Sequence, residues 1–335
     1  MPRRPSMRPI PTPSATRGPT FRVKDARADG HTDWSTRGAR MLIPTPSVRT
    51  VTPLQGLDGR AAAFALALPD DVVFSHVTAA RLWGLPLPRC LESPGDHDPL
   101  HVMRITSRPA VERSGCVHHR GLERRTVTRV KGVPVTSVAD TWCDLIEACP
   151  KLSLGDAVML GDAAVEAIQP TKWVDERHSH ADPASSEWWA DPVAEGCRAL
   201  REPVIVRRSF RGRRLAWAAL RLIRPRVWSP MESYSRVVLV EAELPEPELN
   251  ATITHDDGGG FIAIGDLVWR KQSYRRRVVG EYNGATHEQP SARESDHSKR
   301  LLLEDEGWKV LEIYARDVFT ASGRFTLVHR LRGLL

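Results

Sequence analysis

The pattern of hydrophobic and polar positions divides the chain into four stretches. The first, residues 1–55, is rich in Pro, Arg, Thr and Ser and has almost no apolar periodicity. A segment of this kind buries too little apolar surface to offset the entropy lost on ordering, so we expect a disordered basic tail. A translation start at Met41 would explain the same composition equally well.

The second stretch, residues 56–170, carries apolar spacing of both regular kinds. The segments with helical spacing are 60–69, 75–84, 137–149 and 153–168, and the strand-like segments are 100–106, 114–120 and 131–138. Ser75 or Thr78 can cap the helix that ends at Gly84. Ser75 next to His76 could also suggest a nucleophile and its base, but no acid is placed to complete them, so a helix cap is the better interpretation of Ser75. We expect one α+β domain with a regulatory or DNA-positioning role.

The regular pattern stops at residue 171 and then resumes. Residues 171–206 are dominated by polar residues and Pro and predict a variable linker. Residues 207–225 are strongly basic, and their apolar positions recur at helical spacing at Leu215, Ala218, Ala219 and Leu222. We therefore expect a basic helix that leads into a final domain, residues 207–335.

Most of this final domain alternates between helical and strand patterns. Helical spacing occurs in 229–244 and 295–307, the second segment closed by Gly307, and strand patterns occur in 261–269, 275–284 and 308–314. The order predicts an α/β domain in which a mixed central sheet is flanked by helices.

Three acidic residues fall on these elements. Glu232 lies in the first turn of a helix, Asp266 lies within a strand, and Glu281 lies on the next strand, where Asn283 shares its face. Acids placed in this way can converge on one point. Mg²⁺ binds a few carboxylates, several waters and a substrate phosphate, and it activates water for attack on phosphorus. The pattern predicts a Mg²⁺ (or Mn²⁺) site suited to phosphodiester hydrolysis.

The same blocks, in this order, resemble the PD-(D/E)XK nuclease superfamily, and more closely the very-short-patch-repair-endonuclease-like proteins of bacteria. The matching blocks are MES at 231–233, ELPEPELN at 243–250, DLVW at 266–269, GEYNGATH at 280–287, Asp296 with Arg300, and GWKVLEIY at 307–314. The resemblance implies a restriction-endonuclease-like fold and metal-dependent nicking of DNA. It also implies that Asp266 and Glu281 hold the metal, that Glu232 or His287 is an accessory acid or base, and that Asp296 and Arg300 line the site.

One position departs from the superfamily pattern. A lysine usually follows the strand glutamate by two residues, and this sub-family usually has Asp-Gly there, whereas this chain has Asn283-Gly284. An amide oxygen can ligate a metal but adds no charge. Asn283-Gly284 is also a hairpin-turn signal, Ser229 with Glu232 fits a helix-capping box, and Asp296 with Arg300 fits an exposed ion pair.

The second stretch resembles AbiEi-type antitoxin-like proteins in residues 74–88, 100–106 and 131–145. Such proteins often begin with a winged helix-turn-helix, but residues 1–55 lack the apolar periodicity for one. Together with the departure at Asn283, the resemblance supports an alternative function, a non-catalytic DNA-binding antitoxin or transcriptional regulator that carries a degenerate nuclease fold. A toxin is then a possible partner, which the sequence does not identify.

The net charge and the composition indicate which kinds of partner to expect. The formal net charge of +7 suits a polyanion such as DNA. The residues expected to contact phosphates without reading sequence are Arg211, Arg213, Arg214, Arg275, Arg276 and Arg300. Five cysteines without a C-x-x-C spacing predict no disulfide framework or zinc knuckle, and His118-His119 favours surface polarity over a metal pair. No apolar run approaches the roughly 18 residues of a membrane span, so we expect a cytoplasmic protein with no membrane partner.

Overall fold

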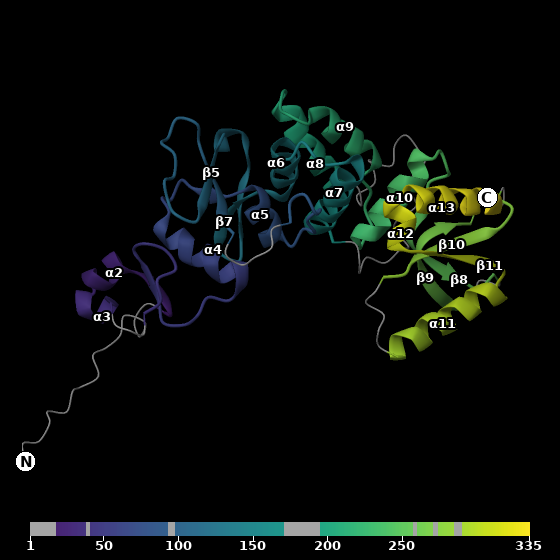
Figure 1. Cartoon of the computed structure of the whole chain (residues 1–335), viewed down its shortest axis with the longest axis horizontal. Coiled ribbons are helices and arrows are strands. Elements are labelled where there is room, and N and C mark those ends of the chain that lie inside the picture. Colours follow the sequence, from purple (N-terminus) through teal and green to yellow (C-terminus); the bar gives the residue numbers. More distant parts are fainter. Residues whose placement is uncertain are drawn as a thin grey trace, which may run out of the picture. The chain divides into compact units, whose positions relative to one another are not determined.

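The computed structural model of the 335-residue chain describes residues 18–37, 41–92, 98–170, 195–256, 260–270, 274–284 and 290–335, with the backbone alone at 34 and 290–296. The described residues form two compact units (Figure 1). Unit 1 comprises the residues up to Gly84 together with Leu91–Asp144, and unit 2 comprises Leu85–Cys90 and Leu145–Leu335. The division therefore falls inside helix α6 (Val138–Ala148), and not at the boundary near residue 170 that periodicity predicts.

Unit 1 begins with a small folded element where the sequence predicts a disordered tail. It consists of β1 (Thr20–Arg22), α2 (Val23–Ala28), α3 (Asp33–Arg37) and β2 (Val48–Thr50). The prediction is wrong for the described residues 18–37 and 41–55, while residues 1–17 lie outside them. The two strands pair antiparallel, and Phe21, Ala26 and Val48 are buried. The Arg113 guanidinium adds a hydrogen bond to Thr45 Oγ1 (2.9 Å). A few buried residues and polar contacts thus order a segment that has no periodicity.

The larger part of unit 1 is a five-stranded sheet with helices packed on it. The strands are β3 (Val73–Phe74), β4 (Leu100–Arg104), β5 (Cys116–Arg120), β6 (Val127–Val130) and β7 (Val133–Thr136), in the order β5-β4-β3-β7-β6. Besides α6, the helical elements are α4 (Gly56–Ala67), α5 (His76–Trp83) and the 3₁₀ helix η1 (Leu122–Arg124). Phe64 of α4 and Leu82 of α5 share a core with Phe74, Leu100 and Val102. These elements confirm the mixture of helices and strands that the periodicity predicts.

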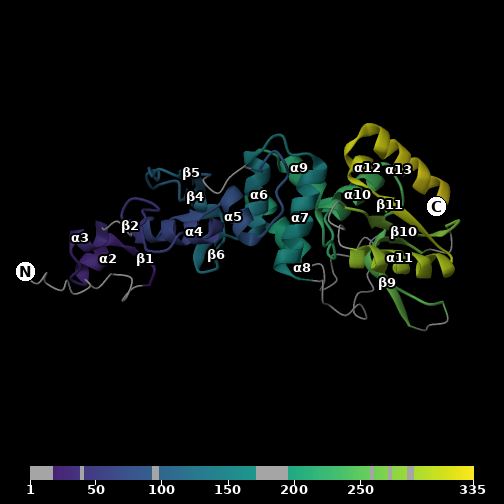
Figure 2. The ribbon, with the colours of Figure 1, turned by 60° about the horizontal axis from the view of Figure 1, so that its bottom comes forward.

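Unit 2 opens with a group of packed helices, α7 (Leu154–Ile168), α8 (Glu195–Val206) and α9 (Arg213–Leu222), in which α7 contacts both others (Figure 2). The variable linker predicted for 171–206 is wrong for 195–206, because Leu200 and Val204 of α8 are fully buried. Residues 171–194 lie outside the described part. The predicted basic helix is confirmed over 213–222, and it begins after Gly212 (φ 83°).

The second sheet holds β8 (Glu248–Thr254), β9 (Phe261–Trp269), β10 (Arg277–Tyr282) and β11 (Trp308–Ile313), in the order β11-β10-β9-β8. Strands β8, β9 and β10 run antiparallel, whereas β11 is parallel to β10. A parallel neighbour requires a crossover connection, and α11 (Pro290–Asp305) supplies it.

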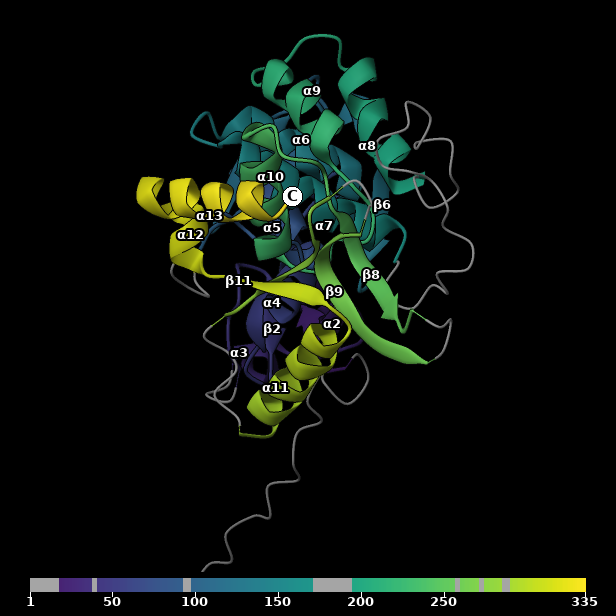
Figure 3. The ribbon, with the colours of Figure 1, turned by 90° about the vertical axis from the view of Figure 1, so that its right-hand side faces the viewer.

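Helices cover both faces of this sheet. Helices α10 (Pro230–Glu241), α12 (Ala315–Phe319) and α13 (Ala321–Leu334) lie on one side and α11 on the other (Figure 3). The first side has a core that includes Leu239, Trp269 and Leu331, and the second has one that includes Val268 and Leu303. The prediction of a mixed sheet flanked by helices is confirmed at this level. No helix in the described part of the chain is long and apolar enough to cross a bilayer.

Candidate functional site

Two carboxylates, those of Asp266 and Glu281, lie on the same face and toward the same end of the sheet in unit 2. Strands β9 and β10 are in register with Val268 opposite Val279, and both valines belong to the core under α11. Asp266 precedes Val268 by two residues and Glu281 follows Val279 by two, so strand alternation places both acids on this face. The Tyr282 N–H donates to Asp266 Oδ2 (2.9 Å) and ties the two strands together there.

A lysine reaches this pair from the crossover helix. Lys299 Nζ lies 2.9 Å from Glu281 Oε2 and also donates to Ile264 O (2.7 Å). Lys299 precedes Leu303 by one helical turn, and Leu303 is buried against the sheet, so the same face of α11 carries both. The sequence interpretation missed Lys299, although its spacing from Leu303 was the available signal.

Glu232, on α10, is the third acid of the site. Only 6% of its surface is exposed. Its Oε2 accepts hydrogen bonds from the Trp228 N–H (3.0 Å) and from Asn250 Nδ2 (2.6 Å). Burial, and to a smaller extent the nearby negative charge of Asp266, raise the pKa of Glu232 to about 6, although the hydrogen bonds that its carboxylate accepts act in the opposite direction. Glu232 and Asp266 are therefore close enough to repel each other.

The start of α10 has a capping role as well. Ser229 Oγ accepts a hydrogen bond from the Glu232 N–H (3.2 Å), and Pro230 occupies the first turn. The Glu232 carboxylate bonds to the N–H of Trp228, the residue before the cap. Ser229 thus caps the helix, while the side chain of Glu232 is directed to the site.

A buried polar network fixes α10, and Glu232 with it, against α7. Asp162 accepts hydrogen bonds from Arg236 Nη2 (2.9 Å), Ser233 Oγ (2.7 Å) and the Arg224 N–H (2.8 Å). Arg236 is fully buried, and both it and Arg224 also pair with Glu246, at 3.1 and 2.8 Å. Each buried charge therefore has an oppositely charged partner, which a charge in such surroundings requires.

Asn283 does not form the predicted hairpin turn. Its N–H donates to Ile313 O (2.8 Å), which continues the hydrogen-bond ladder between β10 and β11. Strand β11 is parallel to β10 and follows it through α11, so no hairpin joins the two strands. The Asn283 side chain forms a hydrogen bond with the side chain of Tyr314. His287 lies outside the described residues, as does the side chain of Asp296.

The arginines expected to bind DNA have different surroundings. Arg300 is held by two acids, Glu304 (2.9 Å) and Glu312 (3.1 Å), and is therefore less available to a phosphate. The Arg213 guanidinium stacks over Trp217 at 5.6 Å from the ring centroid. The other four arginines are exposed. Arg211 precedes α9 and Arg214 lies in its first turn, while Arg275 and Arg276 directly precede β10.

The acids fit a hard cation that keeps part of its water. Glu232, Asp266 and Glu281 do not bring three donor atoms within 4.8 Å of one another, whereas a group in unit 1 does so among the described residues. Mg²⁺ is commonly held by one or two carboxylates with waters in the remaining positions, and Asp266 and Glu281 supply carboxylates of this kind on one sheet face. Burial is the larger cause of the raised Glu232 pKa, and the smaller cause, the negative charge of Asp266, is one that a bound cation would offset.

Fold and site together define a mixed α/β protein with an acidic centre at the end of its second sheet. Two Mycobacterium tuberculosis proteins are similar to it, "Uncharacterized protein MT2308" of strain CDC 1551 / Oshkosh and "Uncharacterized protein Rv2248" of strain ATCC 25618 / H37Rv. Each is 33% identical over 269 residues, which are 79% of this chain and 83% of the relative. The chain therefore belongs to the family of these two mycobacterial proteins. No protein-family model matches it.

Proposed function

We propose that unit 2 carries a restriction-endonuclease-like domain that nicks DNA in a Mg²⁺- or Mn²⁺-dependent reaction. The observation that carries the proposal is the placement of Lys299 Nζ 2.9 Å from Glu281, on a sheet face shared by Glu281 and Asp266. A phosphodiester is an anion that repels nucleophiles, so its hydrolysis requires positive charge beside the reacting phosphorus. Two carboxylates for a cation and one ammonium group beside them suit this chemistry.

Each residue of the site has a role in this proposal. Asp266 and Glu281 would hold the metal, which supplies an activated water and neutralises charge on the phosphate. Lys299 orients the Glu281 carboxylate and places a positive charge near it. The superfamily pattern usually supplies that charge from the position of Asn283, so Lys299 compensates for the departure at Asn283.

Glu232 has the properties of an accessory acid or base. A group transfers protons most effectively when its pKa lies near the working pH, and the Glu232 pKa is raised to about 6. The hydrogen bonds from Trp228 and Asn250 fix its carboxylate. The exposed arginines near α9 and β10 would contact DNA phosphates and hold the duplex without reading its sequence.

A plasmid-nicking assay with the full chain tests the proposal. The wild type is expected to nick supercoiled DNA with Mg²⁺ or Mn²⁺ and to stop in EDTA. Asp266→Asn should abolish nicking, and Lys299→Ala should slow it on the order of 100-fold, because an electrostatic group beside the reacting phosphate is lost. Asp305→Asn, which removes an exposed acid of α11, is the matched control and should leave the rate unchanged.

Two outcomes would contradict the proposal. Equal nicking by the wild type and Asp266→Asn would show that the activity does not come from this site. A wild type that cleaves neither duplex, mismatched nor single-stranded DNA, yet binds DNA, would favour the alternative of a non-catalytic DNA-binding protein.

A further inference from the structure

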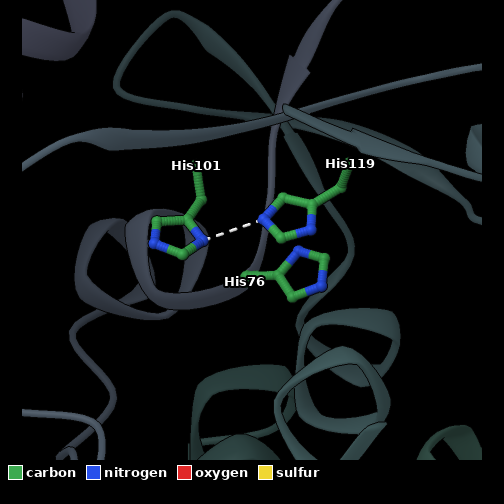
Figure 4. Close-up of side chains that lie close together, drawn as sticks. All are labelled: His76, His101 and His119. Atoms are coloured by element: carbon green, nitrogen blue, oxygen red, sulfur yellow. Dashed lines mark hydrogen bonds between the residues drawn. The ribbon is translucent and has the colours of Figure 1, made fainter. Parts of the chain in front are cut away.

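Three histidines of unit 1 gather on one face of its sheet, outside the acidic site. Strands β4 and β5 are parallel, with His101 opposite Val117 and Met103 opposite His119, so His101 and His119 share a face. His101 Nδ1 and His119 Nε2 are 2.9 Å apart. His76, the first residue of α5, lies against them, and its ring centroid is 3.6 Å from that of His119 (Figure 4).

The surroundings hold these side chains in place. Ser75 Oγ lies 3.0 Å from His76 Nδ1, and Thr78 Oγ1 accepts a hydrogen bond from the His101 N–H (2.8 Å), which ties α5 to β4. His76 adopts a left-handed backbone conformation with φ of 50°. A non-glycine residue in this region costs free energy, and such strain persists where the surrounding structure enforces it. The sequence interpretation treated Ser75 as a helix cap; it does occupy the N-cap position, but its hydroxyl bonds to His76.

The ring nitrogens of the three histidines lie close enough together to share one ion. One nitrogen from each of His76, His101 and His119 lies within 4.8 Å of the other two. Burial lowers the pKa of His101, and burial together with the neighbouring His101 lowers the pKa of His119 to about 4. Imidazoles with lowered pKa values keep their lone pairs at neutral pH, which is the form that binds metal ions.

We propose that His76, His101 and His119 bind a divalent transition-metal ion of the zinc class. Three imidazoles with one further position open to water or another ligand form a common zinc coordination set. Ser75 Oγ hydrogen-bonds to His76 Nδ1, and a hydrogen bond to one ring nitrogen commonly orients a histidine that binds a metal through its other nitrogen. The His76 and His119 rings are nearly parallel, at 19°, so one ring must rotate about its Cβ–Cγ bond when the ion enters.

Position 118 provides a matched control. His118 is adjacent to His119 in sequence, but strand alternation places it on the opposite face of β5, opposite Val102 of the core. The sequence prediction treats His118 and His119 alike, whereas the structure separates them: His119 is half-buried in the group with His76 and His101. His118→Ala and His119→Ala each remove one imidazole from strand β5, but only His119→Ala removes a proposed metal ligand.

The test uses the untagged full chain, freed of metal by a chelator and titrated with Zn²⁺ in competition with an indicator dye. The background is the double variant Asp266→Asn, Glu281→Gln, so that binding at the acidic site does not contribute and this test is independent of nuclease activity. We expect one equivalent of Zn²⁺ to bind, His119→Ala to weaken binding more than about tenfold, and His118→Ala to leave it unchanged. Co²⁺ should give the visible absorption bands of a site with nitrogen ligands.

Failure to bind Zn²⁺, or equal binding by the wild type and His119→Ala, would overturn the proposal and leave the cluster as a hydrogen-bonded part of the fold. If His119→Ala lowers the circular dichroism of the folded chain, His101→Gln and His119→Gln replace it, because the amide keeps most of the volume and polarity. Zn²⁺ binding that survives both glutamine variants would be equally decisive against these ligands.

Discussion

Unit 2 contains two clusters of buried or half-buried acids, and they are built in opposite ways. Around Asp162, between α7 and α10, the donors outnumber the acids: two guanidinium groups, a hydroxyl and a backbone N–H meet Asp162 and Glu246. At the end of the sheet, acids gather instead. Glu232 and Asp266 are close enough for one charge to raise the pKa of the other, and Lys299 is the ammonium group beside Glu281.

The difference separates an acid that holds the fold together from one available to a ligand. Burial raises the pKa of Asp162 as it does that of Glu232, but the groups around Asp162 are donors that offset this effect, so its carboxylate gains little from a metal ion. Carboxylates that repel one another store unfavourable energy, and a cation relieves it when it binds. Each cluster contains an acid on a helix, Asp162 on α7 and Glu232 on α10, so the contrast in surroundings, more than residue type, supports the proposed function.

The largest expected effect is on stability and should be confined to the first cluster. Arg236→Met leaves Asp162 buried without its guanidinium, and we expect the free energy of unfolding to fall by about 3–5 kcal/mol. Asp266→Asn removes a repelling charge and should change the free energy of unfolding by less than about 1 kcal/mol. Urea denaturation followed by circular dichroism measures both. If Asp266→Asn lowered the free energy of unfolding as much as Arg236→Met does, the two clusters would not differ in their contribution to stability, and the proposed contrast would be wrong.

A smaller effect should appear in the pH dependence of stability at Glu232. Because burial raises its pKa to about 6 in the folded chain, the folded state binds more protons than the unfolded state between the ordinary glutamate pKa and about 6. Wild-type stability should therefore decrease as pH rises through this window, by about 2 kcal/mol in total. Glu232→Gln keeps an acceptor for Trp228 and Asn250 but removes the titration. A stability difference between the two proteins that does not change with pH would contradict the raised pKa.

Periodicity was sufficient to predict helices α7, α9, α10 and α11 and three of the four sheet strands of unit 2, but not α8, α12 or α13. Helix α10 and strands β9, β10 and β11 lie where apolar spacing places them, because each buries at least one face against a core. Strand β8 was missed because Pro245 and Pro247 precede it and obscure the pattern. The folded segment of 18–55 was missed for a related reason: short elements with a few buried residues leave no repeat to detect.

The sequence predicted the acids of the site, Glu232 on α10 and Asp266 and Glu281 on adjacent strands, but not the residues whose placement depends on longer-range packing. Asp266 and Glu281 share a face because strand pairing and alternation follow from local pattern. Lys299 comes from a crossover helix whose rotation depends on how Leu303 packs, and the histidine group joins α5, β4 and β5, whose pairing depends on the whole sheet of unit 1. Asn283 was misjudged because a turn signal in the sequence does not reveal that the next strand is parallel.

The most direct test of the central claim is calorimetric titration of the full chain with Mn²⁺, an ion that prefers carboxylate and water ligands. The account predicts that the wild type and Asp305→Asn bind Mn²⁺ equally. It also predicts that Asp266→Asn binds Mn²⁺ more than about tenfold more weakly while unfolding at the same urea concentration. Unchanged Mn²⁺ affinity in Asp266→Asn would contradict a metal site at the end of this sheet.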